Sequence, residues 1–565
     1  MTSEDGAARA AIGMALREAL AARHPRVAVL SDSDSPYGGR ILLARCRLVA
    51  GDVVMSEPPT LQWPMPAAAS KSAQGEPLPD ALRRGFAAAT PVTQAVVSAM
   101  CAPAVTPRDA LLLHEAAARA LPPTADDTDK RDHTAAANAE RCRLMLVAKV
   151  NAHRVAAVAD GEMAAGADAS ACCDVMSKAS HSCAPNCIYD AEQRRYVATA
   201  PLLLPGTPIT FAYFGKEQLF YGREVRREIL ARTHLFQCAC DRCDAPTDPA
   251  RGLPCRVTAC PGTCLRYDEY HDSDTSTATP AASAGQTVAN ASAPRWGAAP
   301  PIEPWRCGAC GTSFADSEMP LTAEHRLAAA TVELFKTRAL CEKGYFEAVR
   351  EIMREAVATL GTQHWVYLLL CHCAMDFYVS LLRTKRVSAF TADTVREMCV
   401  RWAVKAVAAC DAQGVTAAAP LAVADLAVRA ASAGHGCAAV RPAVVALLAY
   451  AKLVMPAFGT VVAGSDAATF LTDELASTTL LDTAVFAPVV DARSRGAVPP
   501  PTFAEAASMV TDDGWCHRAA AAAEADVFAE WEKYLQARVA RAAASGQLNS
   551  LPPQLRAAMG VPSPQ

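Results

Sequence analysis

The chain has 565 residues, more than the roughly 250 to 300 at which one hydrophobic core stops growing, so two or more domains are expected. Its composition, 52% hydrophobic and 20% charged, favours a soluble, helix-rich globular protein. A net charge of −4 provides no basic cluster to neutralise phosphates, so direct nucleic acid binding is not expected. No stretch reaches the roughly 20 uninterrupted apolar residues that span a bilayer, and no secretory signal is recognised, so no membrane role is expected.

The N-terminal part of the chain alternates between strand and helix patterns. The apolar run 26–30 predicts a strand, and residues 40–58 predict a β-hairpin around the turn Gly51-Asp52. Apolar residues at helical spacing predict helices between about 78 and 158, and strand-like runs return between 177 and 214. We therefore expect a β-rich domain with a helical insertion.

The C-terminal part predicts helices almost throughout. A basic helical stretch, 217–233, leads into a cysteine-rich segment, which is interrupted by the Ala-, Ser- and Pro-rich residues 271–304, a predicted disordered insertion. From 321 onward, apolar residues recur at three and four positions, with short breaks expected at Gly344 and Gly361. This pattern favours a stack of paired antiparallel helices of the tetratricopeptide kind.

Cysteines supply the clearest chemical signal. The chain has 22 of them, and ten fall between Cys183 and Cys310. Without a secretory signal, such clustering indicates metal binding in a reducing compartment, the cytoplasm or the nucleus. Cys238, Cys240 and Cys243 offer three thiolates on one tight turn, whereas tetrahedral Zn²⁺ requires four ligands. A fourth ligand must come from another part of the chain.

A second zinc site is predicted by two half-sites on either side of the insertion. Cys255 and Cys260 form the first half, and Cys307 and Cys310 form the second. Cys264 competes with Cys260 as a ligand, so the sequence leaves this choice open.

Five segments in a fixed order carry a family resemblance. They read GRILLA at 39–44, AGDVVMSEPP at 50–59, HSCAPNC at 181–187, GTPITFAY at 206–213 and FQCACDRC at 236–243. Together they resemble the SET-and-MYND (SMYD) family of protein-lysine methyltransferases. The paired Cys and His of a MYND finger are missing between 60 and 170, so the chain is similar to finger-less members of the wider family.

The resemblance implies an α+β protein, a SET-domain β-fold with a post-SET zinc region followed by an all-α domain. The expected domains are a SET domain at 25–235, a cysteine-rich post-SET region at 236–312 and a tetratricopeptide-like helical domain at 320–545. The resemblance also implies a lysine-containing protein substrate, such as a histone, as the partner.

The resemblance further implies residue roles. Cys183 becomes the fourth ligand of the first zinc, and Tyr213 becomes the catalytic tyrosine, although a tyrosine ending a strand also suits a core position with a hydrogen-bonded hydroxyl. S-adenosylmethionine is the implied cofactor. The residues implied to contact it are Gly39, Arg40, Asn151, Ser180, His181, Tyr213 and Phe236. Alone, Arg40 also suits a solvated charge and His181 a core histidine.

Two positions depart from the family pattern. Ser180 replaces an asparagine that helps hold the methionyl amine, and Ile41 replaces a glycine that permits close backbone approach to a ligand. Two hypotheses follow. The first is an S-adenosylmethionine-dependent lysine methyltransferase with structural zinc, and the second is a non-catalytic SET scaffold that binds a protein through its helical domain. A zinc-ribbon nucleic acid binder is disfavoured by the charge balance.

Overall fold

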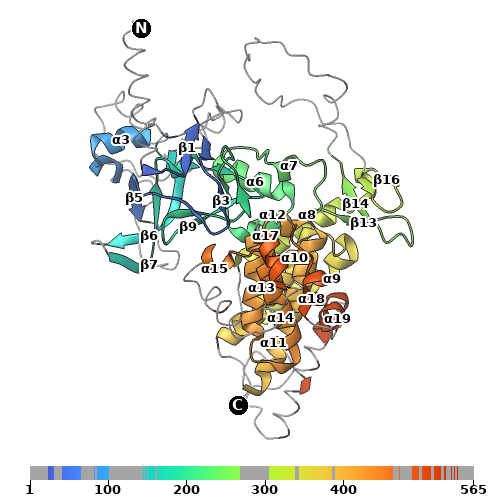
Figure 1. The fold of residues 1–565 in the computed structure, drawn as a ribbon. Coiled ribbons are helices and arrows are strands. Elements are labelled where there is room, and N and C mark those ends of the chain that lie inside the picture. The colour runs from blue at the N-terminus through green and yellow to red at the C-terminus, as the bar shows by residue number, and fades with distance from the viewer. Residues whose placement is uncertain are drawn as a thin grey trace, which may run out of the picture.

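The computed structural model describes residues 23–30, 41–64, 82–100, 144–267, 305–461 and parts of 470–544, with short gaps inside these ranges. Within them the protein is a mixed α+β chain, so the α+β part of the prediction is confirmed, and the SET-type fold stays a prediction. The small β-sheets built from residues 27–211 gather at one end, and long helices pack together at the other (Figure 1). The predicted insertion 271–304 lies outside the described residues.

The strands before residue 212 are short and form several small sheets. Their bounds are β1 Val27–Leu30, β2 Ile41–Ala44, β3 Leu48–Val49, β4 Val53–Ser56, β5 Leu61–Pro64, β6 Ala152–Ala159, β7 Glu162–Cys172, β8 Ser180–His181, β9 Cys187–Asp190, β10 Arg195–Ala198, β11 Leu202–Leu203 and β12 Thr210–Phe211. The sheet orders are β1-β2, β4-β10-β9, β11-β3, β12-β8 and β5-β7-β6. Leu42, Val54, Met176, Tyr196 and Ile209 meet in one core beneath these sheets, each no more than 2% exposed.

The helical insertion is only partly as predicted. α3 (Pro91–Ser98) is helical, but Ala152–Ala159 forms strand β6, and Glu162–Cys172 forms the strand β7 that the sequence did not indicate. Both strands are rich in alanine, the strongest helix former, which explains the wrong prediction. β7 lies between β5 and β6, and such cross-strand partners decide strand formation more than intrinsic propensity does.

The predicted hairpin around Gly51-Asp52 is wrong in its pairing. The turn itself is present, since the N–H of Asp52 donates to Val49 O at 3.0 Å and Gly51 has φ +93°. However, β3 pairs with β11 and β4 pairs with β10, so the strands on either side of the turn belong to different sheets. A turn signal in the sequence shows where the chain reverses direction. It does not determine which strands pair with the two strands that flank the turn.

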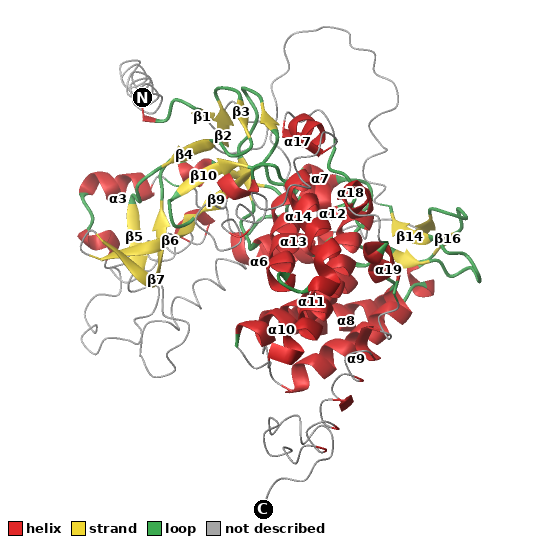
Figure 2. Ribbon diagram, turned by 60° about the horizontal axis from the view of Figure 1, so that its bottom comes forward, coloured by secondary structure: helices red, strands yellow, loops and turns green. Residues whose placement is uncertain are grey.

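Short helices and a separate four-stranded sheet connect the β region to the long helices. The helices are η1 Met176–Lys178, η2 Lys216–Phe220, α6 Arg223–His234 and α7 Asp241–Asp244, and the strands are β13 Leu253–Pro254, β14 Thr263–Arg266, β15 Trp305–Cys307 and β16 Ser313–Phe314. The four strands form an antiparallel sheet in chain order, visible beside the helices in Figure 2. We call this sheet the ribbon.

The C-terminal helices follow the predicted apolar spacing. They are α8 Leu321–Thr337, α9 Lys343–Leu360, α10 Trp365–Arg383, α11 Ala389–Ala412, α12 Val415–Ala418, α13 Pro420–Gly434, α14 Arg441–Val454, α15 Phe458–Val461, α17 Phe486–Ser494, α18 Phe503–Val510 and α19 Trp515–Ala521. Neighbouring long helices pack in sequence order, from α8 with α9 to α13 with α14. The break at Gly361 is confirmed, with φ +73°, whereas Gly344 lies inside α9. The tetratricopeptide class stays a prediction.

α10 is the most deeply enclosed of these helices. Among the described residues it is the one helix long and apolar enough to cross a membrane, but 83% of its apolar window is buried inside the protein. It packs against α8, α9, α11 and α13. Its apolar character is therefore accounted for by packing against other helices.

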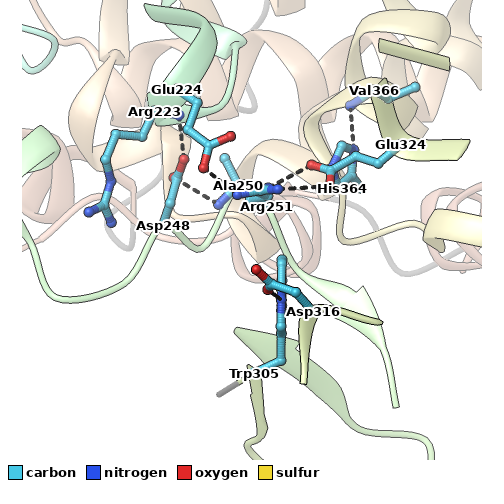
Figure 3. Close-up of polar contacts among 10 residues, drawn as sticks. All are labelled: Arg223, Glu224, Asp248, Ala250, Arg251, Trp305, Asp316, Glu324, His364 and Val366. Atoms are coloured by element: carbon cyan, nitrogen blue, oxygen red, sulfur yellow. Dashed lines mark hydrogen bonds and ion pairs between the residues drawn. The ribbon is translucent and has the colours of Figure 1, made fainter. Parts of the chain in front are cut away.

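Arg251, just before the ribbon, joins three parts of the chain (Figure 3). Its Nε and Nη2 donate to the carboxylate of Glu324 on α8, at 2.6 and 2.9 Å, and its Nη1 pairs with Glu224 on α6. His364 Nδ1 accepts the N–H of Val366, so the ring proton is on Nε2 and is donated to Glu324 at 3.2 Å. A mostly buried carboxylate thus ties the ribbon to the helices.

The Glu324 carboxylate should make stability depend on acid pH. Burial would raise its pKa, but hydrogen bonds from His364 and Arg251 outweigh burial and lower the pKa to about 2, from an ordinary 4.5. A depressed folded-state pKa gives stability that is complete above about pH 4.5 and is lost as the pH falls toward 2, about 3 kcal/mol in total. Glu324→Gln should cost about 3 kcal/mol in urea unfolding at neutral pH, and little near pH 2.

Glu355 provides the matched control for this experiment. It pairs with Arg326 across α8 and α9 on the exposed surface, where solvent screens the interaction. Glu355→Gln should leave the urea midpoint nearly unchanged. If Glu324→Gln behaves in the same way at neutral pH, the buried network does not stabilise the fold.

Candidate functional site

The segments 181–187 and 206–213, separated in sequence, meet in the structure. β8 and β12 pair in parallel, with Ser180 opposite Thr210 and His181 opposite Phe211. Asn186 fastens this pairing, since its Nδ2 donates to Pro208 O at 2.7 Å and its Oδ1 accepts the N–H of Thr210 at 2.8 Å. The two motifs therefore form one structural unit. The ends of its two strands place His181 and Tyr213 next to each other.

The first cysteine cluster forms beside this unit. The Sγ atoms of Cys183, Cys238, Cys240 and Cys243 all lie within 4.8 Å of one another, although Cys183 is 55 residues from the nearest of the others. The N–H of Cys183 donates to Cys240 Sγ at 3.3 Å, and the N–H of Cys243 donates to Cys240 O at 2.7 Å. Four thiols at this separation match a tetrahedral zinc site, so the four-cysteine grouping has the geometry that the sequence and the resemblance predicted.

Arginines hold the backbone around this cluster. Arg227 donates to Cys238 O at 3.0 Å and to Cys243 O at 2.9 Å, and Arg242 donates to Cys183 O at 3.1 Å. These guanidinium groups satisfy carbonyls that the tight turn leaves without a helical or strand partner. The thiols are therefore kept in position from outside the cluster, as is usual for metal ligands.

His181 links the cysteine cluster to Tyr213. Its Nδ1 accepts the backbone N–H of Tyr213 at 3.1 Å, so the ring proton is on Nε2, which lies 3.3 Å from Cys183 Sγ. Burial lowers the pKa of His181 to about 4, which keeps the imidazole neutral. Both ring nitrogens are therefore used by the fold. The position suits a core histidine, and any contact with a cofactor would have to use the ring face or the backbone.

Tyr213 lies at the wall of a cavity of about 360 Å³ between the β region and α13. Its hydroxyl donates to Ala179 O at 2.8 Å, and its ring centroid is 4.9 Å from those of both Phe211 and His234. Leu421 on α13 also lines the cavity. The volume is at the small end of ligand sites and suits one long side chain.

The other predicted cofactor residues divide into two groups. Ser180, His181 and Phe236 gather near Tyr213, with the Phe236 ring 6.0 Å from His181 and 6.1 Å from Tyr213. Asn151 is buried, and its Nδ2 donates to Val147 O at 2.8 Å within its own helical turn. Gly39 and Arg40 lie outside the described residues. The cofactor role of all these residues stays a prediction.

The second cysteine cluster lies in the ribbon. The Sγ atoms of Cys255, Cys260, Cys307 and Cys310 all lie within 4.8 Å of one another. Cys264, which lies on β14 with a fully buried side chain, is not in this group. The structure therefore favours Cys260 over Cys264. The chain reverses direction twice within the ribbon, and these reversals bring the two half-sites together. Cys310 is exposed.

Both clusters can bind a metal ion such as zinc. Each offers four sulfur donors, which is the donor set of structural zinc, and leaves no position for a reacting water. A metal bound there is thus expected to hold the fold together.

Two histidines at this cavity were not identified from the sequence. His234 ends α6, and His153 on β6 stacks on Phe211 with ring centroids 5.4 Å apart. Neither lies in a motif, because His234 precedes the cysteine turn by four residues and His153 lies in an alanine-rich stretch that favoured a helix. The only sequence signal that could have indicated His234 as a site residue was its place directly after the basic end of the predicted helix 217–233.

Comparison with known proteins does not assign a family. No protein-family model matches the sequence, and no curated protein matches it significantly. Family and function therefore have to be inferred from the residues themselves.

Proposed function

We propose that this protein is an S-adenosylmethionine-dependent protein-lysine N-methyltransferase with a SET-type fold, similar to the SMYD family, and with two structural zinc ions. The observation that carries the proposal is the continuous contact from Cys183 through His181 to Tyr213. It joins the zinc cluster to a tyrosine hydroxyl at the wall of a side-chain-sized cavity.

S-adenosylmethionine supplies a methyl group that its sulfonium already activates, so the protein has to bind, aim and desolvate the lysine amine. Phe236 is half-buried and offers a ring face on which an adenine can stack. Phe211 and Tyr213 form apolar walls around the lysine chain, and the Tyr213 hydroxyl marks the reacting end. The partner is a lysine-containing protein, such as a histone, in the cytoplasm or the nucleus.

Calorimetric titration of the purified protein with S-adenosylmethionine tests this function most directly. Binding in the micromolar range, together with methyl transfer to peptides on a lysine array, supports the enzyme. A second candidate is the non-catalytic scaffold, favoured by Ile41, which is 4% exposed where the family pattern has glycine. Binding of a protein without any S-adenosylmethionine binding would establish the scaffold instead.

Ser180→Asn should tighten S-adenosylmethionine binding by about tenfold. Serine is shorter than asparagine and does not reach as far toward a charged amine, whose hydrogen bond is worth about 1.5 to 3 kcal/mol. Ser180 is half-buried at the start of β8, next to His181. Calorimetry of parent and variant measures the change. An unchanged or weaker affinity would contradict it.

Ile41→Gly is predicted to tighten binding further, but its effect on folding has to be separated. Ile41 is buried in β2 opposite Leu30, so removing its side chain should also destabilise the fold by about 2 to 5 kcal/mol. Urea unfolding of this variant measures that cost independently of binding. Ser180→Asn is therefore the cleaner test of the two departures.

A further inference from the structure

The two cysteine clusters differ in how far solvent reaches them. In the first cluster three of the four cysteines are buried and none is exposed, whereas in the second only Cys307 is buried and Cys310 is exposed. Among the cysteines that the structure describes, Cys310 is the most exposed. A small molecule in solution therefore reaches the sulfur atoms of the second cluster more easily than those of the first.

Cys310 is exposed because it lies in the hairpin turn between β15 and β16. The chain turns tightly there, since the N–H of Gly311 donates to Cys307 O at 3.0 Å and Gly311 has φ +73°. Glycine adopts this left-handed conformation without strain. The turn holds Cys310 at the surface, whereas Cys307, at the end of β15, is 1% exposed.

The sulfur atoms of the second cluster form two close pairs, each joining one half-site to the other. Cys255 Sγ lies 3.7 Å from Cys310 Sγ on the exposed side, and Cys260 Sγ lies 3.8 Å from Cys307 Sγ in a partly buried position. A disulfide bond has a length of about 2 Å, so either pair has to approach by less than about 2 Å to form one. The pair of Cys255 and Cys310 is the more accessible of the two.

Bound zinc would keep these cysteines in their reactive form. A thiol that binds a metal ion is deprotonated, and the thiolate is the form that oxidants attack. Among thiolates, susceptibility to oxidation follows exposure. Both clusters would present thiolates when they hold zinc, so exposure decides which of them reacts first.

We propose that Cys310 and Cys255 are an oxidation site for hydroperoxides, and that their conversion to a disulfide releases the zinc ion of the second cluster while the first cluster keeps its own. The proposal concerns the ribbon and does not depend on methyl transfer. Zinc that has lost two of its four ligands is no longer held in a complete tetrahedral site, so it dissociates.

The reaction has two steps. The thiolate of Cys310 attacks one peroxide oxygen, so an S–O bond forms, the O–O bond breaks, and the hydroxide that leaves takes a proton from solvent to become water. The thiolate of Cys255 then attacks the oxidised sulfur, so the S–S bond forms, the S–O bond breaks, and a second hydroxide becomes water in the same way. The two sulfur atoms together lose two electrons, and the peroxide gains them.

The oxidation should stay local and be reversible. The ion pair of Arg251 with Glu324, which attaches the ribbon to α8, contains no thiol that a peroxide can oxidise. We therefore expect the helical circular dichroism to be kept. Dithiothreitol, which is itself oxidised to a cyclic disulfide, should return both thiols, and added zinc should bind again.

The first test measures zinc release with a colorimetric chelator during treatment of the full, zinc-loaded chain with hydrogen peroxide. The parent should release one of its two zinc ions, and peptide mass spectrometry should find a disulfide between Cys255 and Cys310. Cys310→Ser, which keeps a complete first cluster, identifies the ion, because its remaining zinc should stay bound under the same treatment. Release of no zinc, release from the first cluster first, or a different disulfide would overturn the proposal.

The second test separates oxidation from metal binding. Cys310→His replaces one thiolate by imidazole, which is also a zinc ligand, so the site keeps four donors but cannot form the disulfide. This variant should keep both zinc ions in peroxide. Cys260→His is the matched control, with the same donor set but with Cys255 and Cys310 intact, and it should release zinc as the parent does.

Equal zinc release from the two histidine variants would show that Cys310 is not the site of oxidation. If Cys310→His does not load a second zinc ion, the disulfide in the peroxide-treated parent decides. A bond between Cys255 and Cys310 supports the proposal, and any other pairing overturns it.

Discussion

Tyr213→Phe should methylate lysine about 100- to 1,000-fold more slowly than the parent, with S-adenosylmethionine affinity nearly unchanged. The substitution removes only the hydroxyl, which donates to Ala179 O at 2.8 Å at the cavity wall. The ring remains, so its contacts with Phe211 and Phe236 are kept. A group that orients the amine acts at the reacting centre, and its loss should appear in kcat and not in cofactor binding.

Radiometric methyl transfer and calorimetry on the same protein preparations measure the two quantities. Tyr267→Phe is the control, since it removes the hydroxyl of a tyrosine residue that is 42% exposed and lies just after ribbon strand β14. The control should match the parent in rate, affinity and zinc content. An equal rate for Tyr213→Phe would remove this hydroxyl from the mechanism. Absence of S-adenosylmethionine binding in every form would favour the scaffold.

Cys238→Ser should lose one zinc ion per chain and lower the melting temperature on the order of 10 °C. The parent is expected to contain two, one for each cysteine cluster. Cys238 is 2% exposed and Cys243 is fully buried, so removing one thiolate leaves buried sulfur atoms around an incomplete site. Loss of a metal that joins distant segments is among the largest effects a single substitution can have.

Cys183→Ser should have the same effect, which makes the experiment specific. Cys183 is on the β region, and the other three ligands follow α6, so only a shared site predicts equal zinc loss from both variants. The double variant with Cys238→Ser should lose no further zinc, because the two thiolates serve one ion. Cys46→Ser, at a half-buried cysteine outside both clusters, should keep both ions.

Elemental analysis and thermal unfolding monitored by circular dichroism give these values. A Cys183→Ser protein with two zinc ions and a parental melting temperature would separate Cys183 from the first site. A fully folded parent that contains no metal after chelation would refute structural zinc altogether.

The sequence alone was sufficient to predict those features whose stabilising interactions are between residues close together in the chain. Cys238, Cys240 and Cys243 occupy a single turn, so their spacing indicates a shared ligand set before any folding is considered. The long C-terminal helices were likewise predicted from apolar spacing, because a helix buries one face regardless of its partner. The catalytic role of Tyr213 was implied by the resemblance and stays a prediction, and its position on the cavity could not be read from the sequence.

Strand pairing required the tertiary structure. Residues 152–159 and 162–172 are alanine-rich and carry no strand pattern, yet they pair with each other and β7 pairs with β5, about 100 residues earlier. The strands around Gly51 in the same way find their partners at β10 and β11. Pairing energy comes from contacts between distant segments, which a window of neighbouring residues does not contain.

The proton positions and the choice between equivalent ligands were also decided only by the folded chain. Cys260 and Cys264 are equally suitable in sequence, and they are separated by distance, because the Cys260 Sγ lies within 4.8 Å of all three other sulfur atoms and Cys264 is not in that group. The lone pair of His181 is on Nδ1 because this nitrogen accepts the backbone N–H of Tyr213, a residue 32 positions away in the sequence. The residue types determine which side-chain groups can donate or accept a hydrogen bond. Which of these groups come within bonding distance is decided only when the β region, the cysteine clusters and the helices pack together.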